Sequence, residues 1–283
     1  MLNVGVKKSD TTPKGAFSNI SYHCTNENLI MTEFKNKVYI ITGATSGMGK
    51  GIAMKLAEKG ARLIINGRDP EKGEETIKGL KDRGYDCKLV VGDVGLPDTN
   101  KKLVEEAVDH FDRLDGIVCN AGGLGLGPVT EVSMDVWHET LNTNLNAIFY
   151  LSRYAIPEML KRGGGNILVN ASIAAFKFFP NHPAYCAAKA GAVALTKQMA
   201  AEYGPEIRAN AMCPGPVDTP LIWDSAKAFP DPATAVENAG KSTAMKRLGL
   251  PEDIASLACF LLSEEASWIT GTAVTIDGGA IFR

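Results

Sequence analysis

The stretch that decides the fold is Val38-Tyr39-Ile40-Ile41-Thr42-Gly43-Ala44-Thr45-Ser46-Gly47-Met48-Gly49. Its first part is an apolar run of strand length, and its second part places Gly43, Gly47 and Gly49 directly before a helical pattern. Glycines let a backbone turn tightly and approach a pyrophosphate, which the free N–H groups and dipole of the following helix then hold. The stretch therefore predicts a phosphate-binding turn, although a ligand-free strand-to-helix turn can share its pattern.

Outward from this turn, strand-length apolar runs alternate with helical patterns to the end of the chain. The strands are expected at residues 38–42, 62–66, 87–92, 116–120, 166–171, 207–213 and 273–276. Because these runs are apolar on both faces, they suit a parallel sheet covered by helices on both sides. We expect an α/β fold with one doubly wound, seven-stranded parallel sheet, whose ligand site lies beyond the carboxyl ends of the strands.

Capping signals delimit the helices between the strands. The first expected helix follows Gly47 and ends at Gly60, the second begins at Asp69-Pro70 and ends at Gly84, and the third begins at Asp98 or Thr99. A long fourth helix is expected from Ser133 or Asp135 to Arg162, with a kink at Pro157. A fifth is expected over residues 184–203, and the last begins at Pro251. No repeat or interdomain linker interrupts this alternation. We therefore expect one domain over residues 35–283, preceded by a loose N-terminal extension over residues 1–34, which is either a docking arm or a start-site artefact.

Composition excludes several classes of function. The chain has 283 residues, of which 45% are hydrophobic and 22% charged, with a formal net charge of −2. This balance offers no clustered basic surface for nucleic acid or for an anionic membrane. The six cysteines show no zinc-ligand spacing, and no apolar run is long enough to cross a bilayer. We expect reduced thiols, no metal and a cytoplasmic location.

Tyr185 and Lys189 are the first candidate pair for chemistry. They are four residues apart in an alanine-rich helical run, so their side chains share one face. A nearby ammonium favours the phenolate, which would bring the pKa of the tyrosine toward neutral pH and make it a proton donor and acceptor. The pair alone also arises by chance in chains of this length.

Two polar residues add context to this pair. Ser172 follows the fifth expected strand, on the rim where the glycine turn opens, and its hydroxyl could hold a substrate carbonyl or simply satisfy a backbone group. Asn144 lies inside the long expected helix, where asparagine is a poor helix former, and could form a polar link toward the sheet.

Taken as an ordered set, these residues resemble the short-chain dehydrogenase/reductase family. The resemblance rests on Thr42-Gly43-x-x-x-Gly47-x-Gly49, Asn120-Ala121-Gly122, Asn144, Ser172, Tyr185-x-x-x-Lys189 and Pro214-Gly215, and it covers nearly everything from Lys35 onward. It implies a Rossmann-type domain and an oxidoreductase that interconverts a ketone and a secondary alcohol by hydride transfer with NAD(P)(H).

The resemblance also assigns roles. Tyr185 would be the proton donor in reduction and the base in oxidation, Lys189 would bind the nicotinamide ribose and lower the pKa of the tyrosine, Ser172 would orient the carbonyl, and Asn144 would hold a relay water. Asp93 would contact adenine, Asn120 would steady the central sheet, and Thr219 would contact the carboxamide. The implied cofactor-binding set is Gly43, Thr45, Ser46, Gly47, Met48, Gly49, Arg68, Asp93, Val94, Asn120, Ala121, Gly122, Tyr185, Lys189, Pro214, Gly215, Val217 and Thr219.

The choice of cofactor is predicted from the end of the second strand. NAD sites place an acid there for the ribose 2′-hydroxyl, but Asp69 is explained as a helix N-cap, which leaves Arg68 to pair with a 2′-phosphate. NADP(H) is therefore favoured over NAD(H). Many NADP-dependent relatives carry a basic residue where this chain has Ser46, so Arg68 would hold the phosphate almost alone.

The substrate is predicted only as a class. Residues 221–240 occupy the place of the family's substrate lid, and Trp223, Phe229, Pro230 and Pro232, with Phe176, Phe178 and Phe179, could build an apolar pocket for a medium-sized ketone or merely pack the lid. His182 could touch substrate or flank a helix cap.

Two other functions stay open. In a 3-oxoacyl-[acyl carrier protein] reductase, basic residues such as Lys161 and Arg162 would bind the acidic carrier. The helix after Lys189, however, runs Lys197-Gln198-Met199-Ala200-Ala201-Glu202, with an alanine where a second arginine is expected. A non-catalytic NADP-binding regulator, or an epimerase or dehydratase on the same fold, is the other alternative. By resemblance the long helices at 133–162 and 184–203 and the strand at 273–279 predict a homodimer or homotetramer.

Overall fold

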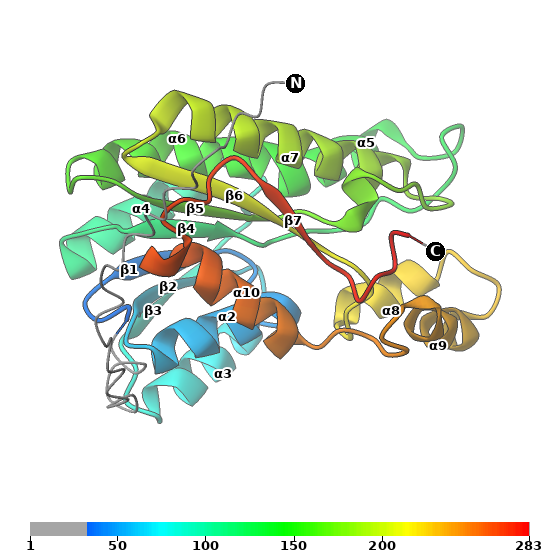
Figure 1. The fold of residues 1–283 in the computed structure, drawn as a ribbon, viewed down its shortest axis with the longest axis horizontal. Coiled ribbons are helices and arrows are strands. Elements are labelled where there is room, and N and C mark those ends of the chain that lie inside the picture. Colours follow the sequence, from blue (N-terminus) through cyan, green and yellow to red (C-terminus); the bar gives the residue numbers. More distant parts are fainter. Residues whose placement is uncertain (1–32, 283) are drawn as a thin grey trace, which may run out of the picture.

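The computed structural model describes residues 33–282, and its centre is a parallel sheet (Figure 1). Seven strands lie in the order β3-β2-β1-β4-β5-β6-β7, and every neighbouring pair is parallel. Their bounds are β1 Val38–Ile41, β2 Arg62–Gly67, β3 Cys87–Val91, β4 Gly116–Cys119, β5 Gly165–Asn170, β6 Ile207–Pro214 and β7 Ala273–Ile276. The expected strands are confirmed to within one residue at each end.

The order of the strands reverses between β1 and β4. From β1 the chain proceeds outward through β2 to β3, then returns to β4 and continues through β5, β6 and β7 on the other side. In doubly wound sheets the loops beyond the carboxyl ends of two such strands diverge and leave a crevice for a ligand. The topology therefore puts the glycine turn after β1 at this crevice.

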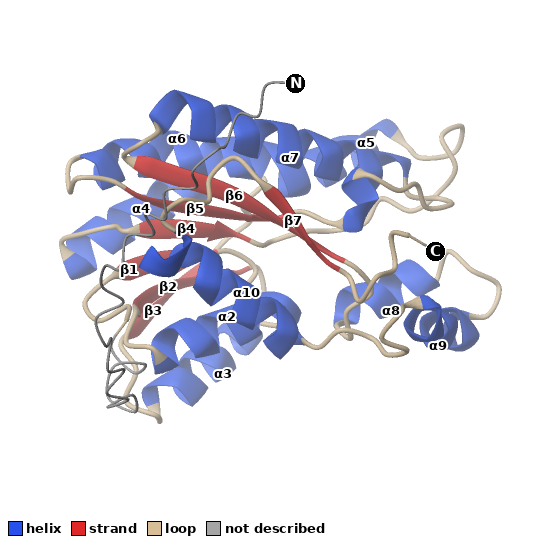
Figure 2. Ribbon diagram, viewed as in Figure 1, coloured by secondary structure: helices blue, strands red, loops and turns tan. Residues whose placement is uncertain are grey.

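Helices cover both faces of the sheet (Figure 2). Their bounds are α2 Gly47–Glu58, α3 Pro70–Lys81, α4 Pro97–Phe111, α5 Met134–Leu141, α6 Ala147–Leu160, α7 Pro183–Tyr203, α8 Pro220–Ala226, α9 Pro232–Ser242 and α10 Pro251–Leu262. Helices α4, α6 and α7 pack on one face, and α2, α3 and α10 on the other. The short helices α8 and α9 lie beyond the carboxyl ends of the strands, where Figure 1 shows them apart from both layers.

Two helix predictions need correction. Helix α4 begins at Pro97, because proline suits the first helical position, and not at Asp98 or Thr99. The helix expected from Ser133 to Arg162 is divided into α5, a π-helical turn at Asn142–Asn146, and α6. Hydrophobic periodicity does not reveal a π-helical turn, since one extra residue barely changes the pattern.

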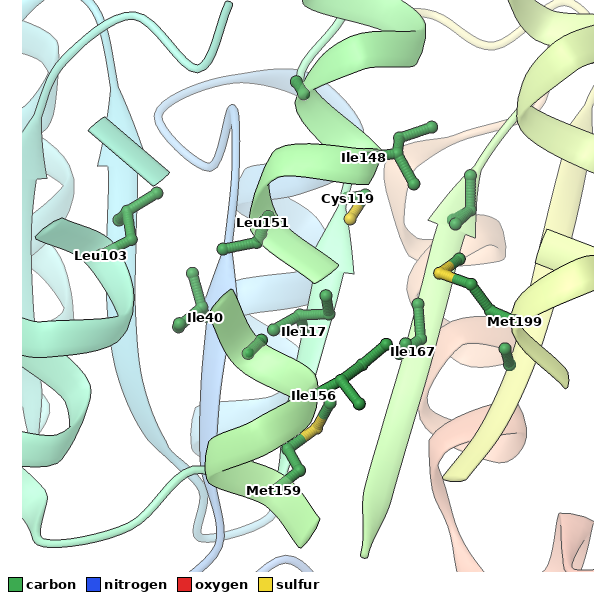
Figure 3. Packing of buried hydrophobic residues seen from close by; sticks show 14 of the residues in the cluster. Ile40, Leu103, Ile117, Cys119, Ile148, Leu151, Ile156, Met159, Ile167 and Met199 are labelled. Carbon is green, nitrogen blue, oxygen red and sulfur yellow. The ribbon is translucent and has the colours of Figure 1, made fainter. Parts of the chain in front are cut away.

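The core consists of two clusters, one on each face of the sheet. In the cluster under α6, Leu151 and Ile156 face Ile117 and Ile167 of the central strands (Figure 3). All four side chains are at most 5% exposed. Because both faces are buried in this way, the sheet is a rigid platform for the loops at its carboxyl edge.

The N-terminal boundary lies slightly earlier than expected. Phe34, which the sequence analysis assigned to the extension, is fully buried with its ring centroid 5.7 Å from that of Tyr39. Glu33 pairs with Lys59 at 2.6 Å. The folded body therefore includes both residues, and the rest of the predicted extension, residues 1–32, lies outside the described residues.

Candidate active site

The glycine turn after β1 has no room for side chains. Gly43 and Gly47 have φ angles of +60° and +50°. A Cβ on Gly49 would lie 2.3 Å from the Gly43 carbonyl oxygen and 2.4 Å from the Asn120 amide nitrogen. No side chain caps the first N–H groups of α2, and no acid stands in its first turn. The turn thus offers a narrow cradle of uncapped donors, which fits the pyrophosphate of a dinucleotide.

Thr42 and Asn120 hold this turn against the end of β4. The Asn120 side chain donates hydrogen bonds to the carbonyls of Thr42 and Gly43, both at 3.0 Å. In return the Thr42 hydroxyl accepts hydrogen bonds from the backbone N–H groups of Asn120 and Ala121. Asn120 therefore braces the switch point between β1 and β4, as the resemblance implied for it.

A groove of about 370 Å³ runs from the glycine turn across β2 and β4, and we call it the polar groove. Its lining contains fourteen of the predicted cofactor residues: Gly43, Thr45, Ser46, Gly47, Met48, Arg68, Asp93, Val94, Asn120, Ala121, Gly122, Tyr185, Lys189 and Thr219. Gly49 supports the turn from behind, while Pro214, Gly215 and Val217 line the neighbouring cavity instead.

Two cations stand at one end of the polar groove. Arg68 is exposed, and its guanidinium lies 3.8 Å from the Glu139 carboxylate. Asp69 accepts hydrogen bonds from the N–H groups of Glu71 and Lys72, as expected of an N-cap. The Lys72 ammonium lies 3.6 Å from the Asp69 carboxylate and lines the same groove. Arg68 is therefore not the only basic residue at this end, because the first turn of α3 adds Lys72.

Asp93 lies at the far wall of the groove, after β3. Its carboxylate accepts a hydrogen bond of 2.8 Å from the Gly95 N–H, so it also stabilises its own turn. Val94, beside it, is 3% exposed. Both residues line the groove, so they are accessible to an adenine ring bound there.

A second cavity, of about 420 Å³, adjoins the groove, and we call it the apolar cavity. Its walls come mainly from the loop after β5 and from α8 and α9, with apolar side chains that include Leu124, Ile173, Phe179, Leu221, Ile222 and Phe229. Of the aromatic residues expected here, Trp223, Phe176 and Phe178 are instead 47%, 52% and 89% exposed and do not line it. Pro230 and Pro232 do not line it either.

Tyr185 lies where the two spaces meet, since it lines both of them. Ser172 lines only the apolar cavity, and Lys189 only the polar groove. The Ser172 hydroxyl hydrogen-bonds the Tyr185 hydroxyl and also accepts a 3.1 Å hydrogen bond from the Ala174 N–H. The Lys189 ammonium lies 5.5 Å from the centroid of the Tyr185 ring and donates a 2.8 Å hydrogen bond to the Asn170 carbonyl. The structure thus brings the predicted triad together at one boundary.

Burial shifts the pKa values of this triad. Loss of solvent raises the pKa of Tyr185 to about 12, and the hydrogen bond from Ser172 opposes that rise. Burial lowers the pKa of Lys189 to about 8, against the weaker effects of Cys213 and Cys119. The sequence analysis expected the lysine to lower the pKa of the tyrosine, but in this structure the opposing contribution comes from Ser172. Tyr185 is therefore protonated at neutral pH.

Asn144 occupies the middle of the π-helical turn. Its amide donates 2.8 Å hydrogen bonds to the carbonyls of Gly123 and Thr140, and its oxygen accepts one of 3.4 Å from the Gly123 N–H. A Cβ on Gly122 would lie 2.9 Å from this oxygen and 3.7 Å from the Lys189 ammonium. Asn144 thus connects the loop after β4 to the π-helical turn that follows α5. Its own side chain lines neither the polar groove nor the apolar cavity.

Sequence reasoning missed several residues of the polar groove. Asn170, at the end of β5, donates a 2.8 Å hydrogen bond to the Asn120 side chain, and its own buried side-chain oxygen has no partner. Such an unpaired buried acceptor at the groove suits a ligand with a hydrogen-bond donor. A polar residue ending an apolar strand was the available signal for Asn170. Lys72 was detectable as the residue one helical turn beyond Arg68.

Comparison with known proteins agrees with this geometry. Residues 43–280 match a family model described as enoyl-(acyl carrier protein) reductase. The chain is 37% identical over 248 residues to an uncharacterized oxidoreductase of Thermotoga maritima, covering 87% of this chain and 98% of that protein. It is 36% identical over 254 residues to cyclohexanol dehydrogenase of Acinetobacter sp. (strain SE19), covering 89% and 98%. The structure of levodione reductase superposes with a TM-score of 0.85 at 31% identity, covering 88% and 99%.

The chain therefore belongs to the short-chain dehydrogenase/reductase family and is an oxidoreductase with a Rossmann-type fold. Membership in this family implies a nicotinamide dinucleotide cofactor, and the cradle of Gly43, Gly47 and Gly49 has the shape to hold its pyrophosphate.

Three further findings concern the described residues. None of their helices is both long and apolar enough to cross a membrane. Among residues 33–282 no group of three or more metal-ligating side chains gathers. Cys87, Cys119, Cys186, Cys213 and Cys259 are all free thiols.

Proposed function

We propose that this protein interconverts a ketone and a secondary alcohol, with NAD(P)(H) as the hydride carrier and Tyr185 as the proton donor and acceptor. The observation that carries the proposal is the position of Tyr185 between the two spaces, with Ser172 on the side of the apolar cavity and Lys189 on the side of the polar groove. A carbonyl group that is reduced receives a hydride from the cofactor and a proton from the protein. With Tyr185 at the boundary, the proton donor would lie between the space for the cofactor and the space for the substrate.

In the reductive direction the Tyr185 hydroxyl gives its proton to the carbonyl oxygen, and in oxidation the phenolate takes the proton of the alcohol. The Ser172 hydroxyl holds the same oxygen and keeps it in line with the phenol. When bound, the cofactor supplies the hydride to the carbonyl carbon or accepts it from the alcohol carbon. A protonated Tyr185 at neutral pH, with its pKa raised to about 12, suits the reductive direction.

Lys189 is the residue of this chain that would hold the ribose of the nicotinamide. It is 4% exposed, and its ammonium is fixed by the Asn170 carbonyl. Its pKa of about 8 means that a small electrostatic change at the groove decides its charge near neutral pH. A bound dinucleotide brings negative phosphates, which favour the charged ammonium and through it the phenolate.

The apolar cavity supports an apolar ketone of medium size as the substrate. About 420 Å³ of space is lined mainly by aliphatic and aromatic side chains. Ser172 and Tyr185 are the polar groups placed to meet the reacting carbonyl, and Lys177, Asn238 and Ser242 add polar groups elsewhere on the wall. The names of two similar proteins, cyclohexanol dehydrogenase and levodione reductase, refer to a cyclic alcohol and a dione. We therefore favour a cyclic ketone or alcohol over a sugar, whose hydroxyls would lose hydrogen bonds in such a cavity.

We propose NADP(H) as the preferred form of the cofactor. Arg68 and Lys72 place two cations at the end of the polar groove, and the nearby acid Asp69 is engaged in capping α3. A carboxylate engaged in this way is less free to bind a ribose 2′-hydroxyl, whereas guanidinium and ammonium groups suit a 2′-phosphate.

One alternative is a reductase of acyl groups on a carrier protein, which the description of the family model brings forward. The basic residues expected to grip the carrier are engaged with acids, since Lys161 pairs with Glu158 and Arg162 with Asp112. This pairing makes the free ketone the better proposal. A regulator without catalytic activity is the other alternative, and the complete set of Asn144, Ser172, Tyr185 and Lys189 argues against it.

We also propose a homodimer or homotetramer in the cytoplasm. Phe149 lies on α6, within one of the helices predicted to self-associate, and is 50% exposed. Trp268, shortly before the strand predicted to form the second interface, is 99% exposed. The free thiols of the described cysteines fit a reducing compartment.

Fluorescence titration of the purified protein with NADPH and NADH tests the cofactor, and a substrate panel with the tighter form tests the reaction. The panel contains cyclohexanone, a substituted cyclic diketone, an acyclic ketone, an aldohexose and a 3-oxoacyl thioester. Turnover of a cyclic ketone supports the proposal, and preference for the thioester would favour the carrier-protein alternative. Tight binding without any turnover would favour the regulator, and binding of neither nucleotide would refute the assignment.

A further inference from the structure

His182 stands outside the triad but lies at the centre of the contacts around the apolar cavity. It immediately precedes α7, the helix that carries Tyr185 and Lys189, and it is only 4% exposed. A buried imidazole needs hydrogen-bond partners for both ring nitrogens. Both partners are present, and one of them belongs to α8 on the opposite wall of the cavity.

The two hydrogen bonds of His182 have different directions. Its Nδ1 lies 2.6 Å from the Pro180 carbonyl oxygen, and its Nε2 lies 2.8 Å from the Ser225 hydroxyl. Because a carbonyl oxygen can only accept, these partners assign the proton of the neutral ring to Nδ1. Nε2 then accepts from Ser225, which connects α8 directly to the start of α7.

Asn181 adds two connections beside this one. Its φ of +60° is left-handed. Its side chain donates a 3.5 Å hydrogen bond to the Ala228 carbonyl just after α8, and its own carbonyl accepts one of 3.0 Å from the Gly127 N–H in the loop after β4. The pair Asn181 and His182 therefore joins three separate walls of the cavity.

The imidazole is also part of the cavity wall. Its ring centroid lies 6.3 Å from those of Tyr185 and Phe179, with both pairs in edge-on geometry. Because its two nitrogens are occupied, the ring presents carbon and edge rather than a free polar group to the cavity. The link to Ser225 thus keeps the lid helix α8 in place and keeps the wall beside Tyr185 apolar.

We propose that His182 is a positioning residue that holds α8 over the substrate cavity through Ser225, and so sets the affinity for an apolar ketone rather than the rate of its reduction. This inference rests on the proposed function, because it assigns the apolar cavity to the substrate. His182 reaches no reacting atom in this scheme, since Tyr185 and Ser172 meet the carbonyl.

The test compares Ser225→Ala with Ser256→Ala. Ser256 lies on α10 outside both the apolar cavity and the polar groove, and its hydroxyl donates a 2.8 Å hydrogen bond to the Glu252 carbonyl of its own helix. Ser225→Ala is expected to raise KM for the best cyclic ketone about three- to tenfold, the equivalent of one lost hydrogen bond, with little change in kcat. Ser256→Ala should leave KM nearly unchanged, and Ser225→Thr, which keeps a hydroxyl, should restore the wild-type KM.

His182→Phe completes a double-mutant cycle, because it keeps an aromatic ring in the wall and removes both hydrogen bonds. If the link to Ser225 carries the effect, the double variant His182→Phe/Ser225→Ala should raise KM no further than His182→Phe alone. Simple additivity of the two effects, or a Ser225→Ala variant that matches Ser256→Ala, would overturn the proposal.

Hydrogen exchange of the α8 amides in the substrate-free protein separates this proposal from the proposed function. Ser225→Ala should accelerate exchange across Pro220–Ala226, whereas Ser256→Ala should not. Unchanged exchange refutes the link even if no substrate is found, while absence of turnover in the wild-type protein with accelerated exchange in the variant refutes only the proposed reaction. Faster exchange with an unchanged KM in an active enzyme would overturn the role in substrate affinity.

Discussion

At the scale of single residues, the chemistry that we propose depends on Tyr185. Its hydroxyl bonds Ser172, and its position faces both the groove and the cavity. Tyr185→Phe removes the proton donor without changing the shape of the ring. We expect kcat to fall by about 10²- to 10⁴-fold, the usual contribution of a positioned acid, while NADPH titration gives nearly the wild-type affinity. Substantial residual turnover would mean that another group donates the proton.

Arg68 decides the preference between the two cofactor forms in our proposal. Arg68→Asp removes a charged partner of the 2′-phosphate and adds a repulsive carboxylate, so the ratio of NADPH to NADH affinity should fall at least about tenfold. Arg83→Asp is the matched control, because Arg83 is exposed, pairs only with Glu58 among the ion pairs described, and lies outside the polar groove. An unchanged ratio in Arg68→Asp would show that Arg68 is an ordinary surface residue.

Lys189 should leave a signature in the stability of the cofactor-free protein. Its folded pKa of about 8 lies below the ordinary value of 10.5, so between these pH values the unfolded chain binds more protons than the folded one. The contribution of Lys189 to the free energy of unfolding should therefore rise with pH in this window, by about 1 kcal/mol per pH unit. The buried thiols of Cys119, Cys213 and Cys259, whose pKa values burial raises, act in the opposite direction, so the contribution of Lys189 is measured against a variant without it. Urea unfolding between pH 7.5 and 9.5 checks it.

Lys189→Met is the reference for this measurement, because methionine fills similar space without a titrating group. The difference in the free energy of unfolding between wild type and variant should change with pH in favour of the wild type as pH rises above 8. The measurement stops below pH 10, where Tyr185, whose pKa is raised to about 12, would begin to act in the opposite direction. Parallel curves would contradict the shifted pKa of Lys189.

At the scale of elements, the turn between β1 and α2 is determined by sterics. Gly49→Ala would drive a Cβ to 2.3 Å from the Gly43 carbonyl oxygen, and backbone cannot yield as a flexible side chain does. We expect a loss of about 1–3 kcal/mol in the free energy of unfolding and a strong loss of dinucleotide binding. Thermal unfolding and NADPH titration measure the two effects.

Gly79→Ala is the control for this prediction. Gly79 lies inside α3, and a Cβ there meets nothing within 4 Å. Alanine is the better helix former, so this variant should be more stable than wild type by up to about 1 kcal/mol and bind nucleotide normally. Equal effects of the two substitutions would show that the cradle tolerates a side chain.

At the scale of the whole molecule, two exposed faces predict self-association. Sedimentation should give a native mass two or four times that of the chain. Phe149→Glu, on α6, should dissociate one interface, and Trp268→Glu, before β7, the other. Val91→Glu is the control, since Val91 is 43% exposed on β3, at the edge of the sheet opposite β7. A monomeric wild-type protein would contradict the prediction.

The sequence alone was sufficient to predict the fold, and it also pointed to the candidate triad of Ser172, Tyr185 and Lys189. Strands buried on both faces have continuous apolar runs, and helices begin at caps such as Asp69-Pro70, so both can be read from local chemistry. The glycine turn could be predicted for the same reason, because a backbone with left-handed φ angles strongly favours glycine over other residues.

Only the tertiary structure decided how these residues divide the space. Ser172 lines the apolar cavity, Lys189 lines the polar groove, and Tyr185 lines both. This division depends on where β5 and α7 lie relative to each other, and no local sequence pattern contains that information. The same is true of the π-helical turn at Asn144, of Lys72 beside Arg68, and of the bond from His182 to Ser225. Local sequence determines which elements form, whereas contacts between residues 43 positions apart, as in that last pair, exist only once the elements have packed.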